Sequence, residues 1–207
     1  MTPEDLRRRL NYLLYAERVT RILARRSGPV AGYRWRAPNP AWNDPTRLTS
    51  HRAPPLPFHS FVHRGAGTCR VCGQPIYGGG SFRSFAGPVS KRLTWHSVCT
   101  ATYFLMTKPT DQSEALILRQ GGRCAITAEP IGPPAREWCS AVDIDHEVPL
   151  FRVARLHADE PWFELIRFWM TGNLRAITPA AHKAKGADEA RERARYRAPI
   201  PDQEALL

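Results

Sequence analysis

Residues 142–150 read VDIDHEVPL, a stretch in which apolar and polar side chains alternate ahead of a proline. Alternation with a period of two is typical of a short strand with one buried face. We therefore expect a strand over 142–146, with Asp145 and His146 at its carboxyl end. A carboxylate beside an imidazole serves both acid–base and metal chemistry, so the rest of the chain is interpreted from this pair.

A second stretch, GNLRAITPAAHKAK over residues 172–185, predicts a strand and then a helix. The strand is expected over 173–177. Thr178 is a favourable N-cap, and the proline after it suits the first position of a helix that should end near residue 196. Residues 160–170 are apolar on nearly every side and predict a buried helix between the two strands. The predicted order is therefore strand, strand, helix, with the buried helix inserted between the strands.

Folded together, these elements bring two imidazoles and a carboxylate to one place. Asp145 and His182 can bind one divalent cation, while His146 points away and stays free to take a proton from water near pH 7. Lys185 lies one turn after His182 on the same helical face. This division of roles suits hydrolysis of a phosphodiester, in which the cation neutralises the developing charge.

These residues resemble the signature of the HNH, or ββα-metal, nucleases. The pattern DxDHxxP over 143–149, followed by Asn173 and by His182-x-x-Lys185, is similar to the HNH domain of RNA-guided CRISPR nucleases and to phage HNH endonucleases. The resemblance covers about residues 121–196 and implies an α+β chain with a ββα-metal core. It also implies a role for each residue: His146 as general base, Asp145 and His182 as ligands of Mg²⁺, Mn²⁺ or another transition metal, Asn173 as a brace of the loop between the strands, and Lys185 as a phosphate contact.

Upstream, two matched half-sites predict a zinc module. Cys69-x-x-Cys72 is followed, after 23 residues, by His96-x-x-Cys99 with the same spacing. Together they supply the four ligands of a tetrahedral structural zinc, and Gly73 suits the tight turn of a metal-binding knuckle. The pattern resembles treble-clef or LIM-like zinc modules. The zinc is expected to stabilise the module rather than to take part in catalysis.

Two further cysteines lie outside that module. Many HNH proteins carry a structural zinc on two Cys-x-x-Cys pairs; here Cys124 keeps one position, but Thr127 replaces its partner and no cysteine follows the last helix's histidine. We interpret Cys124 and Cys139 as packing thiols, with a second zinc site as the alternative. An odd number of cysteines and no signal-peptide pattern predict a cytoplasmic protein, with nucleoid or phage association as options.

The formal charge of +11 is concentrated in the first half of the chain. Residues 1–110 contain 17 Lys/Arg and four acidic residues, whereas residues 111–207 contain 13 Lys/Arg and 15 acidic residues. A polyanion would therefore be held mainly by the first half. No apolar run is long enough to span a membrane. The expected partner is DNA, most simply duplex DNA.

Two basic segments could make that contact. Residues 2–26 predict a helix capped by Thr2, with a leucine stripe from Leu6 to Leu14, whose arginines either form a solvated face or lie along phosphates. Residues 29–57 contain seven prolines and predict an extended arm. Its aromatic and arginine side chains either stack on bases or wrap around the protein's own surface. The residues expected to contact nucleic acid are Arg34, Trp35, Arg36, Arg70, Lys91 and Arg92.

The predicted organisation has three parts: a basic helix and arm (1–60), a zinc module (61–110) and an HNH nuclease domain (111–207). Short helices are expected over 97–106 and 111–120. The predicted function is metal-dependent cleavage of DNA that leaves a 5′-phosphate and a 3′-hydroxyl, and a double-strand cut would need a homodimer or two successive events. The alternative is a zinc-stabilised DNA-binding protein whose HNH fold does not cut. A third interpretation, a LIM-like interaction module, leaves the second half unexplained.

Overall fold

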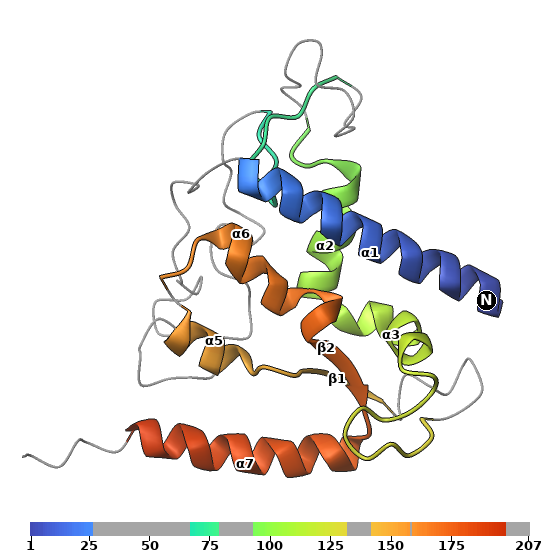
Figure 1. Ribbon diagram of the computed structural model, residues 1–207, viewed down its shortest axis with the longest axis vertical. Helices are drawn as coiled ribbons and strands as arrows, with labels where there is room; N and C mark the ends of the chain where they lie inside the picture. Colours follow the sequence, from blue (N-terminus) through green and yellow to red (C-terminus); the bar gives the residue numbers. More distant parts are fainter. Residues whose placement is uncertain (27–66, 79–92, 132–141, 158, 198–207) are drawn as a thin grey trace, which may run out of the picture.

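The computed structural model describes residues 1–26, 67–78, 93–131, 142–157 and 159–197. Within them the chain forms helices around one small two-stranded sheet, an α+β arrangement (Figure 1). The predicted arm over 29–57 lies outside the described residues. So do Cys139 and most of the predicted nucleic-acid contacts, namely Arg34, Trp35, Arg36, Lys91 and Arg92.

Helices dominate the order of elements, and η marks the short 3-10 helices. The elements are α1 (Pro3–Arg26), α2 (Ser97–Thr107), η3 (Pro109–Gln112), α3 (Ser113–Arg119), β1 (Asp143–His146), α5 (Leu150–Leu156), α6 (Trp162–Leu165), η4 (Ile166–Trp169), η5 (Thr171–Asn173), β2 (Leu174–Ile177) and α7 (Pro179–Arg197).

Most predicted elements are present, with three differences. The helix expected over 111–120 begins as the 3-10 helix η3 before α3. The apolar segment 160–170 is not one helix, because it changes from α6 to the tighter η4. The helix α5 was not predicted, since its seven residues are too few to show a clear period.

α1 begins at the expected capping box. Asp5 N donates to Thr2 Oγ1 at 3.2 Å, and Thr2 N donates to the Asp5 carboxylate at 2.9 Å. The predicted leucine stripe is wrong at Leu14, which is exposed. The buried face lies further along the helix and is rich in small residues that let α2 approach closely: Leu13, Ala16, Val19, Thr20, Leu23 and Ala24.

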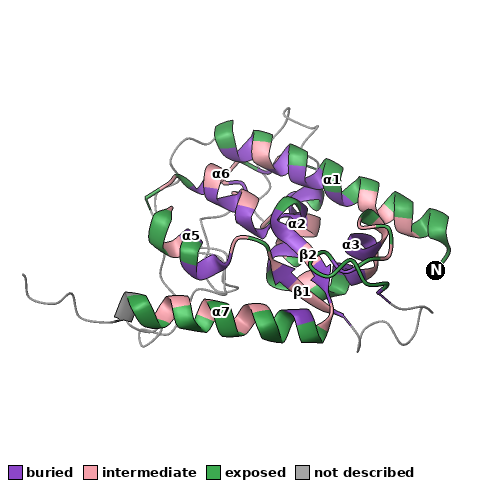
Figure 2. Ribbon diagram, turned by 60° about the horizontal axis from the view of Figure 1, so that its bottom comes forward, coloured by how far each residue is buried: buried purple, intermediate pink, exposed green. Residues whose placement is uncertain are grey.

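One core joins parts of the chain that are far apart in sequence. It contains residues of α1, the turn around Cys69 and Cys72, α2, α5, α6 and η4. Figure 2 shows these elements turning their buried faces toward one another. Trp162 Nε1 of α6 donates to the Val71 carbonyl in that turn at 3.1 Å. The core therefore runs without interruption across residue 110, where a domain boundary was predicted.

The sheet sets the position of the candidate catalytic residues. β1 and β2 are antiparallel, with Asp145 opposite Arg175 and His146 opposite Leu174. α7 follows β2 directly and lies against β1 (Figure 1). The Thr178 hydroxyl accepts a hydrogen bond from the Ala181 amide at 3.3 Å, which is the predicted N-cap. The predicted order of strand, strand and helix is thus observed.

Within the described ranges, none of the helices combines the length and the apolar character that crossing a bilayer would require.

A buried carboxylate connects α1 to the turn that precedes β2. The two oxygens of Glu17 accept hydrogen bonds from the Thr171 amide and the Thr171 hydroxyl, both at 2.9 Å. Burial raises the pKa of Glu17, and the hydrogen bonds from Thr171 oppose the rise. Arg119 of α3 also holds this turn, because its guanidinium donates hydrogen bonds to the carbonyls of Thr171 and Leu174. The turn carrying Asn173 is therefore held from α1 and from α3.

Replacing Glu17 with alanine should lower the free energy of unfolding by about 2–3 kcal/mol, because two buried donors on Thr171 lose their acceptor. Glu17→Gln is the matched control and should cost less, since its amide oxygen still accepts one of the two bonds. Urea unfolding of the zinc-loaded variants at pH 7 measures the difference. Equal stability of the two variants would contradict this role.

The Glu17 carboxylate should also make the free energy of unfolding depend on pH, with lower stability at higher pH. Because the folded pKa of Glu17 lies above the ordinary 4.5, the native state holds this proton more tightly than the unfolded chain. Stability from this group is therefore lost as the pH rises from 4.5 through the folded pKa, and Glu17→Gln should lack that loss.

Candidate zinc centre and candidate catalytic cavity

Four side chains gather into a buried cluster. The ligand atoms of Cys69, Cys72, His96 and Cys99 all lie within 4.8 Å of one another. His96 Nδ1 is 3.5 Å from the Cys72 sulfur and 3.8 Å from the Cys99 sulfur. Its other ring nitrogen, Nε2, is 3.2 Å from the Pro75 carbonyl oxygen, so that Nδ1 faces the thiols. This Cys3His set fits a structural zinc.

The backbone prepares two of these ligands in one turn, which we call the first knuckle (residues 67–76). Cys69 N donates to the Gln74 carbonyl at 2.8 Å, and Gly73 N donates to the Cys69 carbonyl at 2.9 Å. Gly73 has φ 76°, a left-handed conformation that glycine adopts readily, in agreement with the tight turn predicted here. His96 directly precedes α2, and Cys99 lies in its first turn.

The pKa shifts of the three thiols are consistent with a site that binds a cation. Burial raises the pKa of Cys72 and Cys99, and the neighbouring Cys69 raises both further. For Cys69 burial acts in the same direction, but hydrogen bonds from the other two thiols and His96 outweigh it and lower its pKa. Burial and the neighbouring Cys69 thus oppose the ionisation of Cys72 and Cys99. A zinc ion makes three thiolates compatible with one buried site.

The purified protein should contain one zinc per chain, and Cys99→Ser should remove most of it because one of four ligands is lost. Cys124→Ser is the matched control: it removes a buried thiol outside the cluster and should leave the zinc content unchanged. Elemental analysis of protein purified in zinc-supplemented, reducing buffer measures both. A wild-type protein free of zinc under these conditions would contradict the assignment.

A separate cavity of about 320 Å³ lies between β1, α5 and α7. Figure 1 shows where β1, α5 and α7 lie. The apolar residues that line the cavity include Met106, Ile144, Pro149, Leu150 and Phe151. The polar lining includes the predicted site residues Asp145, His146, His182 and Lys185, together with Glu189 and Arg193.

Asp145 is buried and already compensated by two cations. Its Oδ1 accepts a hydrogen bond from Lys185 Nζ at 2.6 Å, and its Oδ2 accepts one from Arg175 Nε at 3.0 Å. Lys185 Nζ also donates to the His146 carbonyl at 2.8 Å and lies 2.6 Å from a Glu189 oxygen. Lys185, predicted to contact phosphate, is thus surrounded by three oxygens of the protein itself and ties α7 to β1.

His182 pairs with a carboxylate that the sequence analysis did not single out. Its Nδ1 lies 2.8 Å from Asp143 Oδ2, and both side chains are partly exposed. Among the described residues, the Cys3His cluster is the only group of three or more His, Cys, Asp or Glu side chains gathered closely enough to hold a metal. The expected cation ligands Asp145 and His182 therefore line one cavity but are held in two separate pairs.

His146 lies at the end of β1 with its side chain largely enclosed. Burial lowers the pKa of His146 to about 4; the Asp145 charge opposes this shift and the Lys185 charge adds to it. The imidazole is therefore neutral at pH 7, as an acceptor of protons must be.

We expect the His146 ring to remain neutral from about pH 5.5 to 8, because its enclosed position disfavours the charged form. Nitrogen and carbon chemical shifts of the histidine rings, assigned by comparison with His146→Gln, measure its protonation. A midpoint near the ordinary value of 6.5 would contradict the enclosed position.

Asn173 braces the segment after His146. Its Oδ1 accepts a hydrogen bond from the Val148 amide at 2.7 Å, and its Nδ2 donates to the carbonyls of Val148 (3.0 Å) and Phe168 (2.8 Å). The Asn173 carbonyl also accepts from the Glu147 amide at 2.8 Å. Three of these bonds fix the backbone that leaves β1, and the fourth connects Asn173 to η4 through Phe168.

Sequence reasoning missed Asp143, Arg175 and Glu17. The alternation over 142–146 places Asp143 and Asp145 on one face of the strand, so it contained a signal for the first. Arg175 is opposite Asp145 only in the observed register. No local pattern marks Glu17 as a residue that bonds to the turn before β2.

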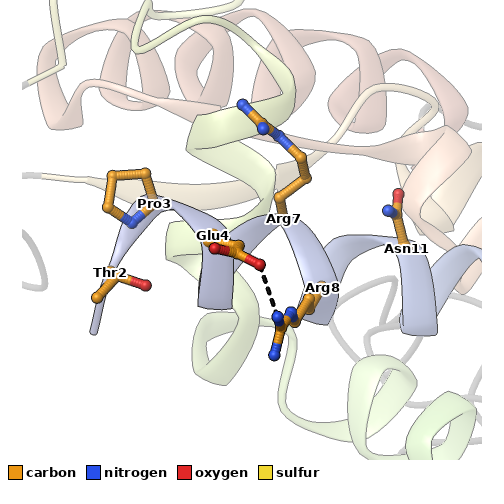
Figure 3. Close-up of a pocket in the computed structure, with 6 residues that line it drawn as sticks. All are labelled: Thr2, Pro3, Glu4, Arg7, Arg8 and Asn11. Atoms are coloured by element: carbon orange, nitrogen blue, oxygen red, sulfur yellow. Dashed lines mark hydrogen bonds and ion pairs between the residues drawn. The ribbon is translucent and has the colours of Figure 1, made fainter.

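The arginines of α1 differ in their surroundings, and contact with phosphates stays a prediction. A hollow along the first turns of the helix (Figure 3) contains Arg7 and Arg8, both exposed. Arg8 is paired with Glu4 at 2.6 Å within the helix. Arg9 instead turns toward the protein, where its Nε donates to Gln112 Oε1 at 2.9 Å. Of the other predicted nucleic-acid contacts, the described residues include only Arg70, whose guanidinium lies 5.9 Å from the centre of a tryptophan ring.

No family model, curated protein or solved structure matches this chain. The resemblance to HNH nucleases therefore depends on its residues and their geometry alone. The geometry by itself supports a coarser description, namely an α+β fold with a Cys3His cluster suited to a structural zinc.

Proposed function

We propose that this chain is a metal-dependent HNH endonuclease in which His146 is the general base. The observation that carries the proposal is a neutral imidazole at the end of β1, in a cavity shared with Asp145 and His182. A neutral imidazole can take a proton from water as the water attacks phosphorus. The bonds from Asn173 to the backbone after β1 support it, because they hold the base in place.

In this proposal Asp145 and His182 hold a divalent cation, Mg²⁺ or Mn²⁺, which supplies positive charge to the phosphate when bound. The donor types suit such a cation, but their present pairing does not join them. For Asp145 to bind a cation, its Oδ1 must either be shared between the cation and Lys185 or lose its hydrogen bond from Lys185. A released Lys185 would be free to contact the phosphate. Asp143 then orients His182 by holding its Nδ1.

The proposed substrate is DNA. The first 110 residues contain 17 Lys/Arg and four acidic residues, so they attract a polyanion toward a cavity whose own half is slightly acidic. Attack in line with the leaving 3′-oxygen would leave a 5′-phosphate and a 3′-hydroxyl. One cavity per chain cuts one strand, so a double-strand cut needs two chains or two events.

His146→Ala should reduce nicking of supercoiled plasmid by about 100- to 10,000-fold, because the attacking water loses its base. His157→Gln is the matched control, since that histidine pairs with Glu160 and does not line the cavity. Reactions contain Mg²⁺ or Mn²⁺, with a parallel series in chelator. Zinc content and circular dichroism establish that each variant is folded. Cutting by His146→Ala at the wild-type rate would reject His146 as the base.

A second candidate function is zinc-stabilised DNA binding without cleavage. One observation favours it: both carboxylate oxygens of Asp145 are paired with protein cations, Lys185 and Arg175. This alternative predicts DNA binding that weakens steeply with salt, is indifferent to added Mg²⁺, and is accompanied by no nicking with any metal.

A further inference from the structure

A ten-residue segment in front of the sheet is similar in sequence to the first knuckle. Residues 67–76 read GTCRVCGQPI, and residues 122–131 read GRCAITAEPI. Glycine, cysteine, proline and isoleucine occupy the same four positions in both. The difference that matters for metal binding is Thr127, which stands where the first knuckle has Cys72. We call residues 122–131 the second knuckle.

The two knuckles have the same backbone hydrogen bonds. Cys69 N donates to the Gln74 carbonyl, and Cys124 N donates to the Glu129 carbonyl, each at 2.8 Å. In both, the amide four residues after the cysteine donates back to the cysteine carbonyl, at 2.9 Å in each. The isoleucine amide donates to the carbonyl of the first glycine, at 2.7 Å and 2.8 Å. The residue before the cysteine pairs with the proline in both.

The second knuckle keeps this shape at a cost in backbone strain. Ala128 occupies the position of Gly73, and both are left-handed, with φ 59° and 76°. A left-handed conformation is unfavourable for alanine, because its Cβ approaches the following carbonyl oxygen, whereas glycine avoids this contact. The conformation of the second knuckle is therefore imposed by its hydrogen bonds and its packing rather than by local preference.

A helix further along the chain from each knuckle corresponds as well: α2 for the first and α7, which follows β2, for the second. His96 precedes α2 and Cys99 lies three residues later; Thr178 precedes α7 and Ala181 lies three residues later. The carbonyls of His96 and Thr178 accept the amide four residues on, at 3.0 Å and 2.9 Å. The four ligand positions of the zinc centre thus correspond to Cys124, Thr127, Thr178 and Ala181.

These four positions lie close together. The Thr178 hydroxyl oxygen is 4.0 Å from the Cys124 sulfur, and the Thr127 amide nitrogen is 3.5 Å from it. Ala181 packs in the same apolar cluster as Cys124. Burial raises the pKa of Cys124, but hydrogen bonds from Thr127 and from backbone amides outweigh it and lower the pKa to about 7. The second knuckle thus retains the amides that a metal-bound thiolate requires.

We infer that the second knuckle and the start of α7 are a second copy of the unit formed by the first knuckle and the start of α2, in which the metal site has been replaced by metal-free packing. One copy has the Cys3His cluster suited to zinc, whereas the other is held by an apolar cluster that contains Ile117, Ile131 and Ile177. The candidate catalytic cavity is built on the metal-free copy, whose helix carries His182 where the zinc copy has Thr100. The inference does not depend on the proposed function.

Restoring the three lost ligands should restore a metal site. The full-length variant Thr127→Cys, Thr178→His, Ala181→Cys should bind two zinc ions per chain where the wild type binds one. The matched control is Thr127→Ser, Thr178→His, Ala181→Ser, which alters the same positions without adding thiols and should remain at one. Elemental analysis after gel filtration measures the stoichiometry.

A second variant covers the case in which a histidine at the N-cap prevents folding. Thr127→Cys, Ala181→Cys keeps Thr178 and supplies three thiolates with Cys124. Titration with Co²⁺ should then give additional thiolate-to-cobalt absorption, equivalent to a second tetrahedral site. A single metal per chain in both variants would overturn the inference. Failure of both variants to fold would count against it as well, because a vacated site should accept its original ligand types.

Discussion

Three thiols and an imidazole in one buried space are the constraint on which the rest of the structure depends. These four side chains join the first knuckle to α2, and a cation bound among them would remove the repulsion between thiolates. Other elements attach to this joint: Thr20 of α1 donates to the Cys99 sulfur at 3.6 Å, and Trp162 of α6 donates to the Val71 carbonyl. Both partners are distant in sequence, so these contacts close long loops whose entropy opposes folding.

Packing transmits this constraint to the candidate base. Trp169 lies against the indole of α6, with ring centres 6.0 Å apart. The next link is the Phe168 carbonyl, which accepts a hydrogen bond from Asn173; Asn173 in turn holds Val148, two residues after His146. α1 reaches the same turn through its buried carboxylate. The first half of the chain therefore positions the cavity through direct contacts, whatever its charge contributes to binding a partner.

Patterns set by neighbouring residues were predictable, whereas pairings set by tertiary position were not. Spacing alone gave the zinc ligands, and alternation with capping gave β1, β2 and α7. His182 was expected beside Asp145 but bonds to Asp143, because both carboxylates share one strand face and only the placement of α7 chooses between them. The repeated knuckle went unnoticed because four identities in ten residues are weak, and the hydrogen bonds reveal it. No pattern in Leu150–Leu156 was long enough to predict α5.

The last helix is attached to the protein mainly by charge. Ala181 is its one buried residue among those described from 179 to 195, and most of the helix faces solvent (Figure 2). Its polar contacts to the rest of the protein include Lys185 with Asp145, His182 with Asp143, and Glu192 with Arg152 of α5 at 2.8 Å. An anion in the cavity would compete with Asp145 for Lys185, and dissolved salt screens the exposed pair of Arg152 and Glu192. Binding of an anion in the cavity would therefore be coupled to the attachment of α7 to β1 and α5. An anionic ligand and the ionic strength would then shift the same equilibrium, between attached and detached α7.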